Sequence, residues 1–245
     1  MAQATPVPDG GAQQRLLREG RIKARGLMPD CSNYTYLAHV RSEGAETLGV
    51  YKPAQGETPL DDFPDGTLGK REVAAYLVSE ALGWHVVPHT VYRTDGPMGP
   101  GSLQQFIVAK VSEHYFTLMP SRAADFRTMA AFDIIVNNAD RKSGHCLLDG
   151  DGHIWGVDNG LTFHSLPKLR TVIWEFAGEQ IPANLRRDAQ RLAEELVAGD
   201  GWVQRLRHLI TGAEVRSLAQ RARRLADEGR YPEPSSRWAY PWPLI

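Results

Sequence analysis

The chain has 245 residues, with 28 Lys and Arg against 29 Asp and Glu, and a formal net charge of -1. This length is enough for one large domain or two lobes with a substantial core. The balanced charge excludes a global basic field, so the composition gives no sign of binding to nucleic acid or to an anionic membrane. Two cysteines are too few for a disulfide scaffold, which favours a cytoplasmic location. The apolar runs are too short for stable membrane insertion.

The first half of the chain predicts a small antiparallel sheet with one long helix. Residues 1–13 are small, Pro- and Gly-rich, and are expected to be disordered. β-forming residues and turn signals predict strands over 21–25, 34–40, 47–52, 86–92 and 103–108. A short helix over 13–19 precedes them, and a helix over 68–82, closed by Gly83, lies between the third and fourth strands. We therefore expect an N-terminal lobe over residues 14–106.

The second half is predicted to be mostly helical, as a C-terminal lobe over residues 107–229. Helices are expected over 121–138, 181–197, 202–209 and 213–228, with leucines forming their apolar stripes. The arginines of the last helices alternate with acids, which favours a solvated helix face. Residues 230–245 are rich in Pro and Trp and cannot form a regular helix. We expect this segment to pack across the body, because exposed tryptophans are unfavourable; binding to a partner is the alternative.

The stretch from Phe132 to His164 contains the residues best suited to bind a metal ion and to accept a proton. Its Asp-Gly-Asp-Gly turn over 149–152, between short apolar runs, predicts a hairpin. Folding this hairpin back brings the loop before it close to the residues after it. Asp140 and Asp158 are then expected to face one small space, with His145 beside them. Two carboxylates and an imidazole in one place suit a divalent cation and a proton acceptor.

Two other kinds of metal site could use residues of the same stretch. A calcium-binding EF-hand starting at Asp149 would need a bidentate Glu where the chain has Gly160, so a hairpin turn is the better interpretation. A structural zinc site formed by His145, Cys146 and later histidines lacks the usual ligand spacing. Cys146 is therefore interpreted as a core residue of a strand rather than as a nucleophile.

A resemblance to a known family rests on the same loop. The sequence Asp140-Arg-Lys-Ser-Gly-His145, followed after the hairpin by Asp158-Asn-Gly, resembles the atypical kinases, including phosphatidylinositol 3-/4-kinases and HipA-like kinases. In that branch the loop has the form D-R-x-x-x-N. The whole chain also resembles an actinobacterial family related to these lipid kinases. The resemblance implies an α+β fold of the two-lobed protein-kinase-like type.

The resemblance also implies roles for residues of the loop. Asp140 would be the catalytic base and Asp158 a metal ligand for ATP-dependent chemistry with Mg²⁺ or Mn²⁺. His145 stands where the family has a metal-binding Asn. Because imidazole prefers softer metals than Mg²⁺, this difference leaves the identity of the metal open.

The same resemblance implies nucleotide contacts in the first half of the chain. Lys52 would bind phosphates of ATP and Glu72 would hold it in place. The alternatives are a solvent-facing lysine on an edge strand and a glutamate placed by the helix dipole. Ser32 and Asn33 lie in a turn that would cover the phosphates, although an ordinary β-turn explains the same letters.

The link between the lobes would hold the adenine ring. By resemblance, Gln105, Phe106 and Ile107 lie at this link, and core packing explains Phe106 and Ile107 equally well. The predicted function is an ATP- and metal-dependent phosphotransferase acting on a hydroxyl of a protein or small molecule. The presence of His145 in place of the family's Asn supports an alternative, a nucleotide-binding pseudokinase or scaffold. A third possibility is an enzyme with the same fold that transfers AMP instead of phosphate. The sequence names neither the acceptor nor the oligomeric state.

Overall fold

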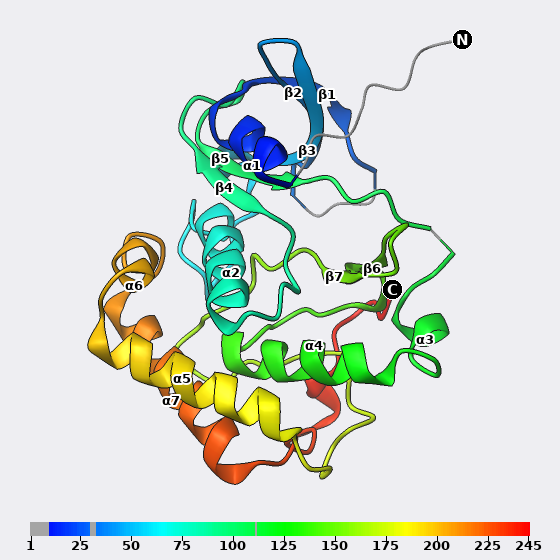
Figure 1. Cartoon of the computed structure of the whole chain (residues 1–245), viewed down its shortest axis with the longest axis vertical. Helices are drawn as coiled ribbons and strands as arrows, with labels where there is room; N and C mark the ends of the chain where they lie inside the picture. The colour runs from blue at the N-terminus through cyan, green and yellow to red at the C-terminus, as the bar shows by residue number, and fades with distance from the viewer. Residues whose placement is uncertain (1–9, 30–32, 111) are drawn as a thin grey trace. The chain divides into compact units, whose positions relative to one another are not determined.

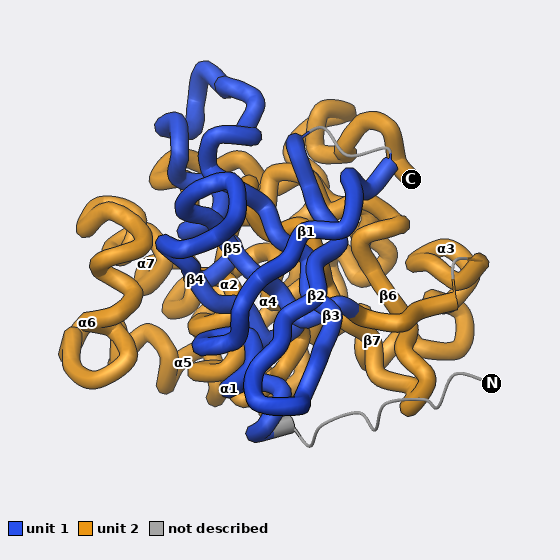
Figure 2. Tube along the Cα trace, turned by 90° about the horizontal axis from the view of Figure 1, so that it is seen from above, with its two compact units in different colours: residues 1–73, 88–106 blue, residues 74–87, 107–245 orange. Residues whose placement is uncertain are grey.

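An antiparallel sheet and a set of helices make up the residues that this computed structural model describes, namely 10–29, 33–110 and 112–245 (Figure 1). The chain divides into two compact units (Figure 2). Unit 1 comprises residues 1–73 and 88–106, and unit 2 comprises residues 74–87 and 107–245. No helix among the described residues is long and apolar enough to cross a membrane.

Unit 1 is built on a five-stranded antiparallel sheet with the order β1-β2-β3-β5-β4. Its elements are α1 (Gly10–Glu19), β1 (Arg21–Leu27), β2 (Tyr36–Ser42), β3 (Ala45–Pro53), the short 3-10 helix η1 (Ala54–Gly56), β4 (Thr90–Arg93) and β5 (Gly101–Gln105). The predicted antiparallel sheet is therefore present. Strand β4 begins later than predicted because the backbone N–H groups of Val86 and Val87 donate to the Ser79 hydroxyl, at 2.8 and 3.2 Å, instead of to a strand.

Helix α1 begins at Gly10, inside the segment that we expected to be disordered up to residue 13. Residues 1–9 lie outside the described residues. The helix is held because Leu17 is fully buried in a cluster with sheet residues such as Tyr51 and Leu103. Arg93 on β4 donates to the carbonyl oxygens of Leu17 and Gly20, at 2.8 and 2.9 Å, which satisfies acceptors at the end of the helix.

Unit 2 is mainly helical and contains one hairpin. Its elements are the second part of α2 (Leu68–Leu82), α3 (Tyr115–Leu118), α4 (Ala123–Val136), the 3-10 helix η2 (Ser143–His145), β6 (Cys146–Leu148), β7 (Ile154–Gly156), α5 (Ala183–Ala198), α6 (Trp202–Leu206), α7 (Gly212–Glu228) and the 3-10 helix η3 (Arg237–Ala239). Most of the predicted leucine positions of the last helices are buried, among them Leu192, Leu206 and Leu218, each 0% exposed. Apolar burial of these stripes packs α5 against α7 and α4 against α7.

The predicted hairpin is present as β6 and β7, paired from Cys146 with Gly156 to Leu148 with Ile154. Asp149 closes its turn. One carboxylate oxygen accepts the N–H groups of Asp151 and His153, at 3.0 and 2.8 Å, and the other accepts the Trp155 indole N–H at 2.8 Å. Both oxygens of Asp149 therefore serve the turn, which supports a hairpin rather than a calcium loop.

The close approach of β3 and β5 gives a test of the sheet. A Cβ atom added at Gly101 would lie 2.3 Å from the Lys52 carbonyl oxygen and 2.7 Å from the Pro53 Cα, and backbone atoms cannot move aside without separating the strands. We expect Gly101→Ala to lower the free energy of unfolding by about 1–3 kcal/mol. Gly26→Ala is the matched control, because nothing lies within 4 Å of its added Cβ. Urea unfolding measures both; equal stabilities would contradict this packing.

Candidate functional site

Lys52 and Glu72 form an ion pair within unit 1. The Lys52 Nζ lies 2.5 Å from the Glu72 Oε1, and the exposed fractions of the two side chains are 21% and 3%. A buried carboxylate is stable only with a cation beside it. The alternative of a solvent-facing lysine on an edge strand is excluded, since β3 pairs with β2 on one side and with β5 on the other. The cation is thus fixed on an inner strand.

The turn between β1 and β2 has an internal role. Ser32 lies outside the described residues. The Asn33 side-chain oxygen accepts the backbone N–H of Thr58 at 2.7 Å, and the Asn33 carbonyl accepts the Thr35 hydroxyl at 3.3 Å. Asn33 therefore ties this turn to the loop after β3. A phosphate contact by its amide nitrogen stays a prediction.

The predicted adenine segment begins at Gln105, the last residue of β5, and continues with Phe106 and Ile107. The N–H of Gln105 donates to the His89 carbonyl at 2.8 Å, and the N–H of Phe106 donates to the Leu48 carbonyl at 3.2 Å. Ile107 is buried, with 8% exposed. Nucleotide contacts at Gln105 and Phe106 would therefore use atoms other than these N–H groups, and adenine binding here stays a prediction.

Two asparagines shape the loop that carries Asp140. Asn137 ends α4 in the left-handed conformation, with φ 55°, and its amide donates to the carbonyls of His164 and Leu166 at 2.9 and 2.8 Å. Asn138 accepts the Asp140 N–H at 3.0 Å and donates to the Asp133 carboxylate at 3.1 Å. The loop is thus tied both to α4 and to the chain after the hairpin, as expected for loop-shaping residues.

Arg141 and Asp133 form an ion pair in which both side chains are 0% exposed. The Arg141 Nε lies 3.1 Å from both carboxylate oxygens and its Nη2 lies 2.9 Å from one of them. The same guanidinium donates to the Val157 carbonyl and to the Asn159 side-chain oxygen, each at 2.7 Å. The donors of Arg141 are therefore used inside the protein, and none of these contacts is with solvent or a ligand. They fix the two residues on either side of Asp158.

Asp158 lies between these two fixed residues in a strained backbone conformation. Its φ is 57°, a region that residues other than Gly rarely occupy, and its side chain is 50% exposed. His145 Nε2 lies 3.4 Å from the Asp158 carboxylate, while His145 Nδ1 accepts the Lys142 N–H at 3.3 Å. The neutral imidazole therefore carries its proton on Nε2 and directs it at Asp158. In this arrangement His145 orients the carboxylate.

Asp140 has an unusual acidity for an aspartate. Burial raises its pKa to about 6, and the charge of Asp158 adds to the rise. Lys142, whose Nζ lies 3.4 Å from the Asp140 carboxylate, opposes it, as does Arg141. The structure therefore brings the two predicted acids within electrostatic reach of each other. A carboxyl group with a pKa near the working pH is suited to accept a proton during a reaction.

The other candidate ligands do not gather around this site. Cys146 is fully buried, and burial raises the pKa of its thiol to about 12, so it remains a neutral core residue. Within the described part of the chain, no group of three or more His, Cys, Asp or Glu could hold a metal ion. One or two carboxylates nevertheless fit Mg²⁺, which takes its other ligands from phosphates and water.

Two contributors to the site escaped the sequence analysis. Asp133 is one of them; an acid inside the apolar run Phe-Asp-Ile-Ile-Val is the available signal for a buried ion pair. Ser143 is fully buried and its hydroxyl lies 2.8 Å from His114 Nδ1. No sequence pattern links Ser143 to His114, because the two residues lie 29 positions apart in the chain.

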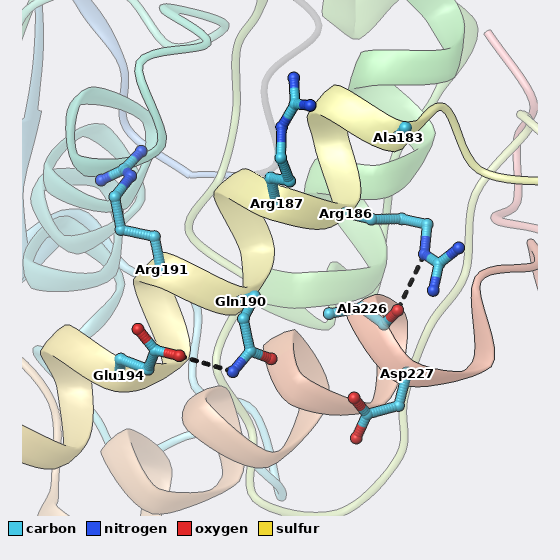
Figure 3. A pocket seen from close by; sticks show the side chains of 8 residues that line it. All are labelled: Ala183, Arg186, Arg187, Gln190, Arg191, Glu194, Ala226 and Asp227. Carbon is cyan, nitrogen blue, oxygen red and sulfur yellow. Dashed lines mark hydrogen bonds between the residues drawn. The ribbon is translucent and has the colours of Figure 1, made fainter.

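A pocket of about 500 Å³ lies between α5 and α7 (Figure 3). Three arginines line it, but Arg187 and Arg191 point away from α7 in this view. Arg186 donates to the Ala226 carbonyl at 2.9 Å, and Arg191 pairs with Glu195 at 3.0 Å. The positive groups do not converge on one point, which agrees with the solvated helix face expected here.

Comparison with solved structures identifies the fold. The structure of hydra Fam20 with sugar matches 93% of this chain and 90% of its own, with a TM-score of 0.57 and 12% identity. The Helicobacter pylori proinflammatory kinase CtkA matches 87% of this chain and 93% of its own at 10% identity, and its TM-score of 0.48 is too low to carry weight. The predicted α+β kinase-like fold is therefore confirmed.

No protein-family model matches the chain. Protein Rv2133c of Mycobacterium tuberculosis is 38% identical over 269 aligned residues, which cover 95% of this chain and 95% of the relative. The chain belongs to the family of this mycobacterial protein.

The buried ion pair gives the test of this site. Arg141→Met leaves the Asp133 carboxylate buried without its cation, and we expect the free energy of unfolding to fall by about 3–5 kcal/mol. Arg224→Met is the control: Arg224 is 76% exposed and 3.6 Å from Glu228. We expect it to change stability by less than about 0.5 kcal/mol.

Adding Asp133→Leu to Arg141→Met removes the stranded charge and should restore part of the loss. Denaturant unfolding compares the three variants. A loss in Arg141→Met as small as that in Arg224→Met would contradict the assigned role.

Proposed function

We propose that this protein is an ATP- and divalent-metal-dependent phosphotransferase that acts on a hydroxyl group. The observation that carries the proposal is the pair Asp140 and Asp158 within a kinase-like fold: Asp140 precedes the buried Arg141 in the chain, and Arg141 binds the residues on both sides of Asp158. Asp140 has a pKa raised to about 6, which suits it to accept a proton, and the side chain of Asp158 is half exposed. The finer relationship to phosphatidylinositol 3-/4-kinases and HipA-like kinases is part of this proposal.

On the nucleotide side, Lys52 binds phosphate oxygens of ATP. Its ion pair with Glu72 holds the ammonium in one position on an inner strand of the sheet. Ser32 and Asn33 cover the phosphates, and Gln105, Phe106 and Ile107 contact the adenine. These five contacts rest on the sequence resemblance.

Asp158 holds the divalent ion, Mg²⁺ or Mn²⁺. The ion supplies positive charge that offsets the negative charge of the phosphates. His145 contributes by donating its Nε2 proton to Asp158, so that one carboxylate oxygen is kept in place. Direct ligation by His145 would require Nε2 to lose that proton and Nδ1 to give up its bond with Lys142.

On the acceptor side, Asp140 takes the proton of the attacking hydroxyl. The hydroxyl oxygen forms a bond to the γ-phosphorus, the bond from that phosphorus to the bridging oxygen breaks, and ADP leaves with the electron pair. Lys142 lies beside Asp140 and places a positive charge next to the reacting groups. Most of the rate enhancement then comes from positioning the two substrates and stabilising the charge of the transition state, and the protein forms no covalent bond with either substrate.

A nucleotide-binding pseudokinase is the second candidate. The observation that favours it is the position of His145 Nε2, which lies 3.4 Å from an oxygen of the carboxylate proposed to bind the metal. Binding of ATP without turnover in the unmodified protein would support it.

Asp140→Asn tests the catalytic assignment. The amide keeps the shape of the side chain and loses the basic oxygen, so we expect transfer of the γ-phosphate to fall by about 10²- to 10⁴-fold. Nucleotide affinity should change little. The matched control is Asp151→Asn in the exposed hairpin turn. ATP labelled at the α- or γ-phosphate identifies the group transferred; label from the α-phosphate alone would indicate AMP transfer and contradict the proposal.

The acidity of Asp140 predicts the pH dependence of the reaction. A base must be unprotonated, so kcat/KM should rise with pH up to the pKa of Asp140, about 6, and level off above it. Lys142→Met removes a cation that lowers this pKa, so the rise should move to higher pH. Profiles of kcat/KM for the two proteins measure the shift; a rise at the same or a lower pH in Lys142→Met would contradict the assignment.

A further inference from the structure

The segment after η3 reaches the 3-10 helix η2, which leads into the hairpin. The Leu244 carbonyl accepts the backbone N–H of Ser143, the first residue of η2, at 2.8 Å. Earlier in the segment, the Ala239 carbonyl accepts the backbone N–H of Thr171 at 3.1 Å. Ala239 is buried, with 3% exposed. The segment is therefore bonded through its backbone both to the chain that follows Asp158 and to η2.

Ser143 is held by its side chain as well as by its backbone. The residue is 0% exposed, and its hydroxyl lies 2.8 Å from Nδ1 of His114, the residue before α3. A buried hydroxyl needs such a partner, because an unpaired polar group inside a protein costs free energy on folding. Two segments that are distant in the sequence thus meet at one residue of η2. We call Ser143, His114 and Leu244 the η2 anchor.

The other end of η2 is joined to the residues around Asp158. The carbonyl of His145, the last residue of η2, accepts the N–H of Val157 at 2.9 Å. His145 Nε2 lies 3.4 Å from the Asp158 carboxylate, which belongs to a side chain that is 50% exposed. Burial alone therefore does not fix this carboxylate. One turn of 3-10 helix and two contacts connect it to the η2 anchor.

We propose that the η2 anchor positions the carboxylate that binds the metal ion. Ser143 is the positioning residue: its two contacts fix η2, and η2 fixes His145, which orients Asp158. This inference rests on the proposed function, in which Asp158 holds Mg²⁺ or Mn²⁺. Loss of a group that orients a metal ligand commonly lowers metal affinity or activity by about 10- to 100-fold. Because the anchor acts through His145, we expect an effect at the lower end of this range.

The first test removes the contact between the hydroxyl and the imidazole. In Ser143→Ala and in His114→Ala, the Mn²⁺ concentration that gives half of the ATP-induced rise in Tm should increase about tenfold. The double variant should show the same increase as each single variant, because both changes delete one contact. Ser235→Ala, at an exposed serine, is the control and should leave this Mn²⁺ midpoint unchanged.

The second test removes the backbone acceptor. A chain that ends at Trp242 lacks the Leu244 carbonyl and keeps that of Ala239, so its Mn²⁺ midpoint should also increase about tenfold. A chain that ends at Leu244 is the control, because it loses only Ile245, which is 66% exposed. A purely structural role of the anchor would lower Tm without ligand and leave the Mn²⁺ midpoint of every variant unchanged.

The two tests separate this inference from the proposed function. Unchanged midpoints in His114→Ala and in the chain that ends at Trp242 would overturn the inference and leave the function in place, and these two variants decide the matter even if Ser143→Ala does not fold. An ATP-induced rise in Tm of the unmodified protein that needs no metal, or no rise at all, would overturn the proposed function and, with it, this inference.

Discussion

The buried ion pair between Arg141 and Asp133 is the constraint on which the rest of the site depends. Both groups are removed from water, which costs several kcal/mol for each ion, and only good geometry with further hydrogen bonds offsets that cost. Here the guanidinium meets both carboxylate oxygens and also binds Val157 and Asn159. A charge pair that is expensive to break thus joins α4, the loop of Asp140 and the chain around Asp158.

The properties of the two acids follow from this arrangement. Asp158 keeps a left-handed backbone because the residues on both sides of it are bonded to Arg141. Asp140 has a raised pKa because the anchored loop holds it partly out of water and near a second negative charge. Unit 1 uses the same principle in the Lys52–Glu72 pair, where a buried carboxylate keeps a cation on an inner strand. In each unit, burial of one charge fixes the position of another.

Local patterns in the sequence were enough to predict the hairpin and the antiparallel sheet, because turn residues and alternating strands act over a few positions. They also placed Asp140 and Asp158 near each other through the hairpin. They did not predict the burial of Arg141. An arginine followed by a lysine in a polar loop is usually exposed, and its partner Asp133 lies eight positions earlier inside a helix. Residues 230–245 pack against the body as expected, but they do so through backbone groups, which leave no pattern in the side chains, and Trp238 and Trp242 stay exposed.

Thermal melting of the protein with ATP, in the presence of Mg²⁺, Mn²⁺ or no divalent ion, tests the central claim most directly. At about a hundred times its dissociation constant, a ligand should stabilise the folded state by roughly 2.7 kcal/mol, which is a shift of several degrees in Tm. We expect a shift that requires the metal and is lost in Asp158→Asn. A shift of equal size without metal, or no shift with either ion, would contradict the assignment of Asp158 to a metal–nucleotide site.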